Sequence, residues 1–99
     1  MIAAKIDSNH KAIVKALRAA GASVVSLAAV GMGVPDLIVG FRGVNYLIEI
    51  KNGPNAKYTP HQIKFIENWF GKVYRVETQE HALECIGAVK PRIVGGACV

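Results

Sequence analysis

The sequence predicts one α/β domain with a mixed sheet, in the order helix, three strands, helix, strand, helix. Two observations support this fold class. Apolar residues recur at helical spacing in segments that alternate with short β-rich runs, and glycine or proline residues separate these segments. The later strand–helix–strand connection requires a parallel strand pair, whereas the earlier strands are close enough in sequence to pair antiparallel.

The first helix is predicted over residues 9–20. The polar run Asp7–Asn9 offers N-caps, and Gly21 ends the helix. Its apolar residues recur at helical spacing and are Ile13, Val14, Leu17 and Ala20. Residues 22–27 are predicted to form a strand, and the glycine-rich segment 31–33 links it to the next one.

The next two strands are predicted over residues 37–40 and 46–51, joined by a short turn at 41–43. A second helix begins at Thr59–Pro60 and ends at Gly71. Its apolar face, expected to pack in the core or at a dimer interface, consists of Ile63, Phe65, Ile66, Trp69 and Phe70. A strand over 72–76 follows, and Thr78 caps a last helix that extends to about Ile86.

Composition limits the classes of function. A chain of 99 residues makes one small domain, assigned to residues 1–90, and its 52% apolar content indicates that some apolar surface is shared with a partner chain. The tail, residues 91–99, is expected to be loose or to lie at a dimer interface. A net charge of +5 favours a polyanionic partner. The two cysteines lack metal-ligand or disulfide-framework spacing, and the sequence shows no signal peptide or membrane span, so a cytoplasmic protein is expected.

Two acids and a lysine form the most informative pattern. Asp36 opens one predicted strand, and Glu49 and Lys51 lie two residues apart on the next, so they share a face. The turn between the strands brings the three side chains together at one end of the sheet. Such a cluster suits a divalent metal with oxygen ligands and an adjacent cation that positions water. The alternative is an ordinary hairpin in which Glu49 and Lys51 form a solvated pair.

Three segments carry a resemblance to a known family: residues 33–40, 46–53 and 58–62. They resemble the PD-(D/E)xK nuclease superfamily and, within it, the stand-alone VRR-NUC domains of phages and bacteria, over roughly residues 7–84. The resemblance implies a restriction-endonuclease-like core and an Mg²⁺- or Mn²⁺-dependent endonuclease that cuts branched DNA. It also implies a homodimer related in fold to Holliday-junction resolvases. No small-molecule cofactor and no membrane partner are expected.

The resemblance assigns roles to individual residues. Asp36, Glu49 and the backbone carbonyl of Ile50 are expected to bind the metal, and Lys51 to orient or deprotonate the attacking water. Gln62 is expected to reach the water or a phosphate, although Thr59-x-x-Gln62 is also a capping-box pattern and the two roles remain open.

The first helix has no glutamate at the position where many relatives carry an additional metal ligand. His10 occupies the corresponding place and is a candidate ligand, with the alternative that it is a surface or capping residue. Asp7 lies about one turn earlier and is the other candidate, with capping again as the alternative.

Several basic and aromatic residues are candidates for DNA contact, through phosphates and without sequence readout. For each lysine and arginine the alternative is an ordinary solvated surface residue. The candidates are Lys57 and Tyr58, beside the expected metal site, and Lys11, Lys64 and Arg42.

The leading interpretation is a homodimeric endonuclease acting on four-way DNA junctions. One alternative keeps the same active site in a nuclease that nicks flaps or duplexes, or that serves as the cutting module of a larger complex. Another alternative is a catalytically silent DNA-binding module. The sequence does not separate the two nuclease readings, because the shape of the DNA substrate leaves no base-reading motif. The silent module is favoured only by the missing acid on the first helix, whereas the intact Asp36, Glu49 and Lys51 argue against it.

Overall fold

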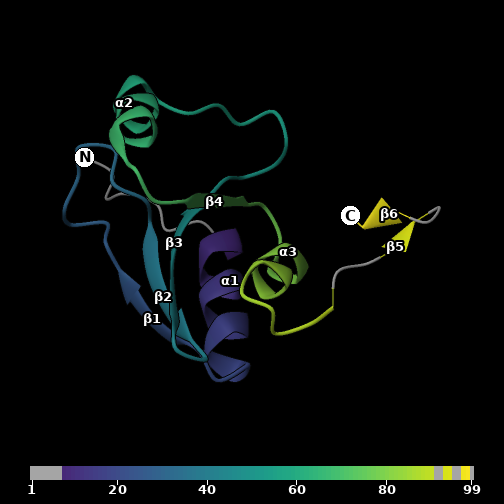
Figure 1. Cartoon of the computed structure of the whole chain (residues 1–99). Helices are drawn as coiled ribbons and strands as arrows, with labels where there is room; N and C mark the ends of the chain where they lie inside the picture. Colours follow the sequence, from purple (N-terminus) through teal and green to yellow (C-terminus); the bar gives the residue numbers. More distant parts are fainter. Residues whose placement is uncertain (1–7, 91–92, 95–96, 99) are drawn as a thin grey trace.

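The computed structural model describes residues 8–90, 93–94 and 97–98, and it has the predicted α/β architecture (Figure 1). α1 and α3 lie side by side against the sheet, and α2 lies at its upper end. Within these residues, no helix is long and apolar enough to cross a membrane. The elements in chain order are α1 (Ser8–Ala19), β1 (Ser23–Ser26), β2 (Leu37–Phe41), β3 (Val44–Ile50), α2 (Pro60–Asn68), β4 (Val73–Val76), α3 (Gln79–Cys85), β5 (Ile93–Val94) and β6 (Ala97–Cys98).

The central sheet is mixed, as predicted. Its strand order is β1-β2-β3-β4, in which β1, β2 and β3 are antiparallel neighbours and β4 is parallel to β3. The parallel pair follows from the crossover through α2, which returns the chain to the start of the next strand. β5 and β6 form a separate antiparallel pair that was not predicted from the sequence.

The turn between β2 and β3 sets the register of the functional strands. It contains two residues, Arg42 and Gly43, with φ of 50° and 81°, as in the hairpin turns that match strand twist. The predicted three-residue turn is therefore wrong, because Phe41 is the last residue of β2 and pairs with Val44. This register pairs Leu37 with Ile48, so Asp36 lies beside the segment that carries Glu49.

The hydrophobic core fills the space between α1, α3 and one face of the sheet. Alternate residues of β2 are buried, as the period of a strand with one covered face requires. Ile13 and Leu17 of α1 are completely buried against them. The other fully buried apolar residues are Leu37, Val39, Ile48, Val76 and Ala82.

The second helix departs most from prediction, because none of its residues is buried and it ends at Asn68. The side chain of Asn68 donates to the carbonyl of Lys64 at 2.9 Å and so takes an acceptor of the last helical turn. Trp69 is 46% exposed and Phe70 fully exposed, so neither packs in the core, and the other predicted place for them, a dimer interface, stays a prediction. α2 covers its face of the sheet loosely, over a groove of about 550 Å³ lined by residues such as Ile38, Leu47 and Phe65.

Candidate active site

Asp36 is fixed between two neighbouring strands. Its carboxylate accepts a hydrogen bond from the backbone N–H of Ile50 at 2.8 Å, and its carbonyl accepts one from Leu27 at 2.8 Å. Pro35 immediately before it is completely buried. The carboxylate is therefore held beside the end of β3, where Glu49 and Lys51 are located.

Glu49 is buried, at 4% exposure, although it lies on the face opposite the main core. Its Oε2 accepts a hydrogen bond from Gln62 Nε2 at 2.9 Å and lies 3.5 Å from Lys51 Nζ. The Lys51 side chain is itself only 11% exposed. The solvated-hairpin alternative is therefore wrong, because burial of two charges requires the specific partners that this cluster supplies.

Gln62 joins the acid, the lysine and the start of α2. Its Oε1 accepts from Lys51 Nζ at 2.8 Å and from the N–H of Thr59 at 2.9 Å, while its Nε2 donates to Glu49. Its own N–H donates to Thr59 Oγ1 at 3.2 Å, which completes a capping box. The sequence left capping and site contact as alternatives, and the structure shows one amide making both sets of contacts.

Burial changes the acidity of Glu49. Desolvation, followed by the charge of Asp36, raises its pKa from 4.5 to about 7, and Lys51 opposes only part of this rise. Ionisation of Glu49 is therefore unfavourable at this buried position beside the charge of Asp36. A cation between them would relieve that repulsion.

The donors present fit a hard divalent cation. Asp36, Glu49 and the carbonyl of Ile50 would hold it through oxygen atoms, the ligands that Mg²⁺ and Mn²⁺ prefer. In the part of the chain that the structure describes, no third His, Cys, Asp or Glu joins the two acids. A small ligand set is compatible with Mg²⁺, which usually keeps several waters.

A close backbone contact ties the Asp36 segment to α2. Gly33 has a φ of 79°, and a Cβ at this position would overlap the backbone carbonyl of His61 and the N–H of Gln62. Only glycine allows both this conformation and this approach. This close approach at Gly33 places the first turn of α2 against the site.

Arg75 is a functional candidate that the sequence analysis missed. It pairs with Glu49 in the parallel β3–β4 register, and its Nη2 donates to the carbonyls of Gly53 and Ala56 at 3.1 and 2.7 Å. Its Nε donates to Glu77 Oε2 at 3.1 Å. A single arginine thus fastens the loop over residues 52–58 to the sheet. The sequence could have indicated Arg75 through its position on the parallel strand beside Glu49. It gave no indication of the loop carbonyls that Arg75 contacts.

The loop over residues 52–58 places two of the predicted DNA-contact residues beside the site. Lys51 Nζ donates to the carbonyl of Lys57 at 3.2 Å, and the ring of Tyr58 lies 5.2 Å from Lys51 Nζ and 5.3 Å from the guanidinium of Arg75. The Tyr58 ring therefore contacts both cations. Lys57 and Tyr58 lie where the sequence analysis expected them, beside the acids.

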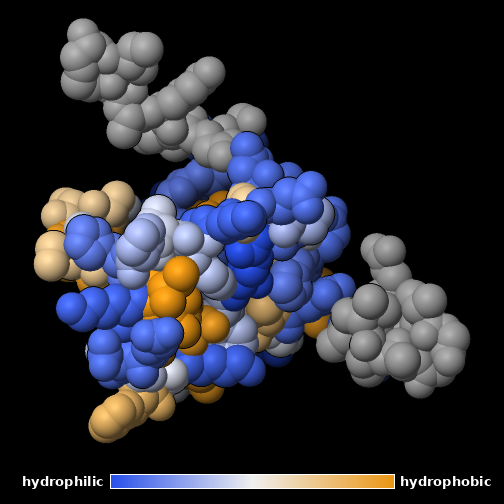
Figure 2. All heavy atoms as spheres, turned by 90° about the horizontal axis from the view of Figure 1, so that it is seen from above, coloured by the Kyte–Doolittle hydropathy of each residue, from blue (hydrophilic) through white to orange (hydrophobic). Residues whose placement is uncertain are grey.

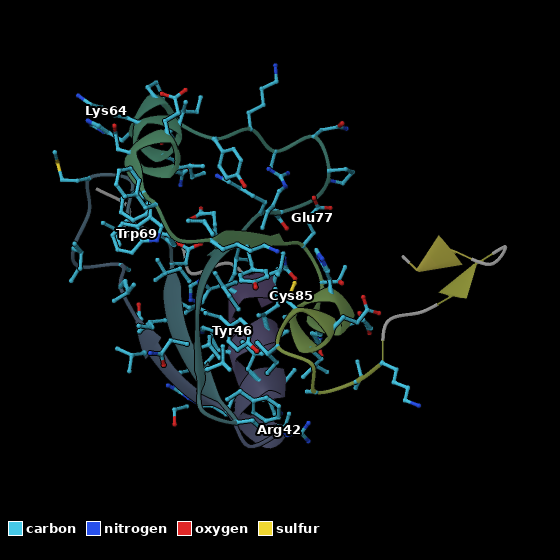
Figure 3. All side chains as sticks on the ribbon, viewed as in Figure 1. Arg42, Tyr46, Lys64, Trp69, Glu77 and Cys85 are labelled. Atoms are coloured by element: carbon cyan, nitrogen blue, oxygen red, sulfur yellow. The ribbon has the colours of Figure 1, made fainter. Side chains whose placement is uncertain are left out.

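The remaining described candidates lie on α1, on α2 and at the β2–β3 turn. Lys64 projects from exposed α2, and Arg42 lies at the β2–β3 turn, at the opposite end of the molecule (Figure 3). His10 and Lys11 line a groove between α1 and β1, and His10 makes no three-ligand group with the two acids among the described residues. Asp7 lies outside the described residues.

Comparison with known proteins gives one informative result. No family model and no curated protein matches the sequence. A solved structure titled "VRR_NUC domain" is similar to the chain, with a TM-score of 0.60 and 29% sequence identity over 77% of this chain and 87% of that one. The similarity to this structure supports a nuclease domain. This similarity supports a VRR-NUC domain, and the fold of the chain is consistent with the PD-(D/E)xK superfamily.

The raised pKa of Glu49 predicts how stability depends on pH when no metal is present. Because the folded protein binds this proton more tightly than the unfolded chain, the stabilisation is complete below pH 4.5 and is lost as pH rises through about 7. Relative to Glu49→Gln, the wild type should lose up to roughly 3 kcal/mol between pH 5 and 8. Urea unfolding in EDTA measures this difference, and a pH-independent difference would contradict the assignment.

The Arg75 contacts predict a local effect. Arg75→Met should increase amide hydrogen exchange in residues 52–58 and lower the free energy of unfolding by about 1–2 kcal/mol, because two carbonyls lose a charged donor. Arg75→Lys should restore part of the protection. Lys72→Met, which removes another cation near the start of the same strand, is the matched control. Equal exchange of the loop in all of these proteins would show that Arg75 does not fasten it.

Proposed function

We propose that this domain is a metal-dependent endonuclease that hydrolyses phosphodiester bonds in branched DNA, with four-way junctions as its substrate and a homodimer as its working form. The observation that carries the proposal is the buried Glu49, which lies next to Asp36 and is bridged to Lys51 through Gln62. A purely structural role does not explain why a buried acid is placed beside a second acid.

The proposed chemistry follows from the polar groups of the site. A divalent cation, Mg²⁺ or Mn²⁺, would supply charge neutralisation and activation of water when held by Asp36, Glu49 and the Ile50 carbonyl. Lys51, a charged donor with three N–H bonds, would orient the attacking water and stabilise negative charge on the phosphate. Gln62 would keep the Lys51 ammonium and the Glu49 carboxylate in position through its two ends.

The surface around the site is compatible with a DNA backbone. The chain carries a net charge of +5, and Lys57 and Tyr58 lie on the loop that borders the acids. Lys11 and Lys64 are exposed, as phosphate contacts must be. Arg42 is a more distant contact and would be reached only by an extended arm of the substrate (Figure 3).

The dimer proposal rests on apolar surface and symmetry. On and near α2, several large apolar side chains are exposed, namely Met32, Ile63, Trp69 and Phe70. Figure 2 shows apolar groups within the largely hydrophilic face seen from above. Paired cuts across a two-fold junction also require two sites related by two-fold symmetry, and each chain supplies one.

Two alternatives remain for the same chain. A nuclease that nicks flaps or duplexes, alone or within a larger complex, would use the same cluster and differ only in the shape of its DNA. A silent DNA-binding module is favoured by one observation, which is the small number of acidic ligands among the described residues. Direct cleavage assays separate these possibilities.

Cleavage of a labelled four-way junction, with duplex and flap controls in Mg²⁺, Mn²⁺ or EDTA, tests the proposal. We expect paired, metal-dependent cuts in the junction. Asp36→Asn, Glu49→Gln and Lys51→Met should each reduce the rate at least about 100-fold, while the DNA affinity in EDTA changes little. Glu67→Gln, an exposed acid on α2, is the matched control. Cutting of flaps or duplex alone would discard the junction role, and binding without cutting in any metal would favour the silent module.

A further inference from the structure

A second concave surface lies outside the acidic cluster, between α1 and the edge strand β1. It is a groove of about 480 Å³. Its floor is apolar and consists of Val14, Val24 and Leu37. Its rim is polar, and it is lined by His10, Lys11, Lys15, Arg18 and Ser26. Lys11 is a candidate phosphate contact and His10 a candidate metal ligand, but the groove that they line has no role in the function described so far.

The groove has one sign of charge. From Ser8 to Pro35 the sequence contains three basic residues, Lys11, Lys15 and Arg18, and no acid. The ion pairs among the described residues are Lys51–Glu49 and Arg75–Glu77, so none of the three rim cations has an acidic partner there. Cations gathered on one rim without acids create a positive potential that attracts a polyanion.

The spacing of the cations matches a nucleic acid strand. Lys11, Lys15 and Arg18 lie on one side of α1 at positions i, i+4 and i+7, and they therefore extend over roughly 10 Å along the helix axis. One strand of a duplex places a phosphate about every 3.4 Å along its axis, so this length corresponds to about three phosphates.

Arg18 is held in position across the groove. Its Nη2 donates to the carbonyl of Val24 on β1 at 3.0 Å. Because a guanidinium carries five N–H donors, this bond fixes the group and leaves donors for a phosphate. A preorganised arginine loses less side-chain freedom on binding than a free one.

One end of the groove reaches the catalytic end of the sheet. Leu37 directly follows Asp36 and pairs with Ser26, and both line the groove. His10 directly follows Asn9, whose Nδ2 donates to the carbonyls of Lys51 and Glu77 at 3.3 and 3.0 Å. The other end lies at Arg18, so the groove leads away from the acidic cluster.

We propose that this groove binds the sugar–phosphate backbone of the substrate strand on one side of the bond that is cut. The proposal rests on the proposed nuclease function for the identity of the polyanion. The rim cations contact about three successive phosphates. These contacts hold the strand in register with Asp36 and Glu49 and carry no sequence information.

The test uses Lys15, an exposed rim residue. Lys15→Gln should weaken binding to a DNA junction several-fold in EDTA, and the slope of log K against log salt should fall by about 1. Lys90→Gln, a matched change of an exposed lysine after α3, should leave affinity and slope unchanged. Fluorescence anisotropy at several salt concentrations gives both quantities. Equal affinities and slopes for the two variants would overturn the proposal.

A second measurement locates the contact. In cleavage assays, Lys15→Gln should raise KM without lowering kcat. The KM values of the variant and the wild type should become equal on substrates that lack about three nucleotides on the side of the cut whose strand lies in the groove. A KM difference that persists whichever side is shortened would contradict a backbone track beside the site.

The failure of the groove proposal and the failure of the nuclease proposal can be told apart. A wild type that cuts while Lys15→Gln behaves like Lys90→Gln overturns the groove alone. A wild type that binds but never cuts, with a changed salt slope for Lys15→Gln, overturns the nuclease function and supports the groove as a DNA track.

Discussion

Burial of the Glu49 carboxylate is the constraint on which the rest of the site depends. An ionised acid at 4% exposure is strongly unfavourable unless charged and hydrogen-bonding partners surround it. Lys51 and Gln62 supply these partners, and the proximity of Asp36 makes the requirement more severe. The cluster is therefore a place where the protein gives up favourable solvation, and such places are concentrated at functional sites.

The same requirement explains how α2 is attached. None of its residues is buried, so apolar packing contributes little to its position. Its first turn is instead fixed by the capping box, by the amide of Gln62 on the acid and the lysine, and by the close approach of Gly33. The main core lies on the other face of the sheet, under α1 and α3. Stability and chemistry thus occupy opposite faces of one sheet, and changes in the site leave most of the core intact.

Much of this arrangement was predictable from local sequence. The order of elements, the mixed sheet and the convergence of Asp36 with Glu49 and Lys51 follow from apolar periodicity and from the strand period. The end of α2 was not predictable from periodicity, because the apolar residues Trp69 and Phe70 continue the helical spacing but lie exposed beyond the end of the helix. The part played by Arg75 was missed because its acceptors are backbone carbonyls of a loop, whose positions only the folded chain defines. The dual role of Gln62 was visible as two alternatives, and only the geometry shows that one amide makes both contacts.

The central claim is that Asp36 and Glu49 form one divalent-cation site, and titration with Mn²⁺ by calorimetry tests it most directly. The account predicts one binding event per chain near pH 6.5. It also predicts proton release, visible as a dependence of the enthalpy on the buffer, because Glu49 has a pKa of about 7 and must ionise. Asp36→Asn and Glu49→Gln should each weaken binding by at least about tenfold, the equivalent of 1.4 kcal/mol, whereas Glu80→Gln should bind like the wild type. Undiminished Mn²⁺ affinity in both site variants would contradict the account.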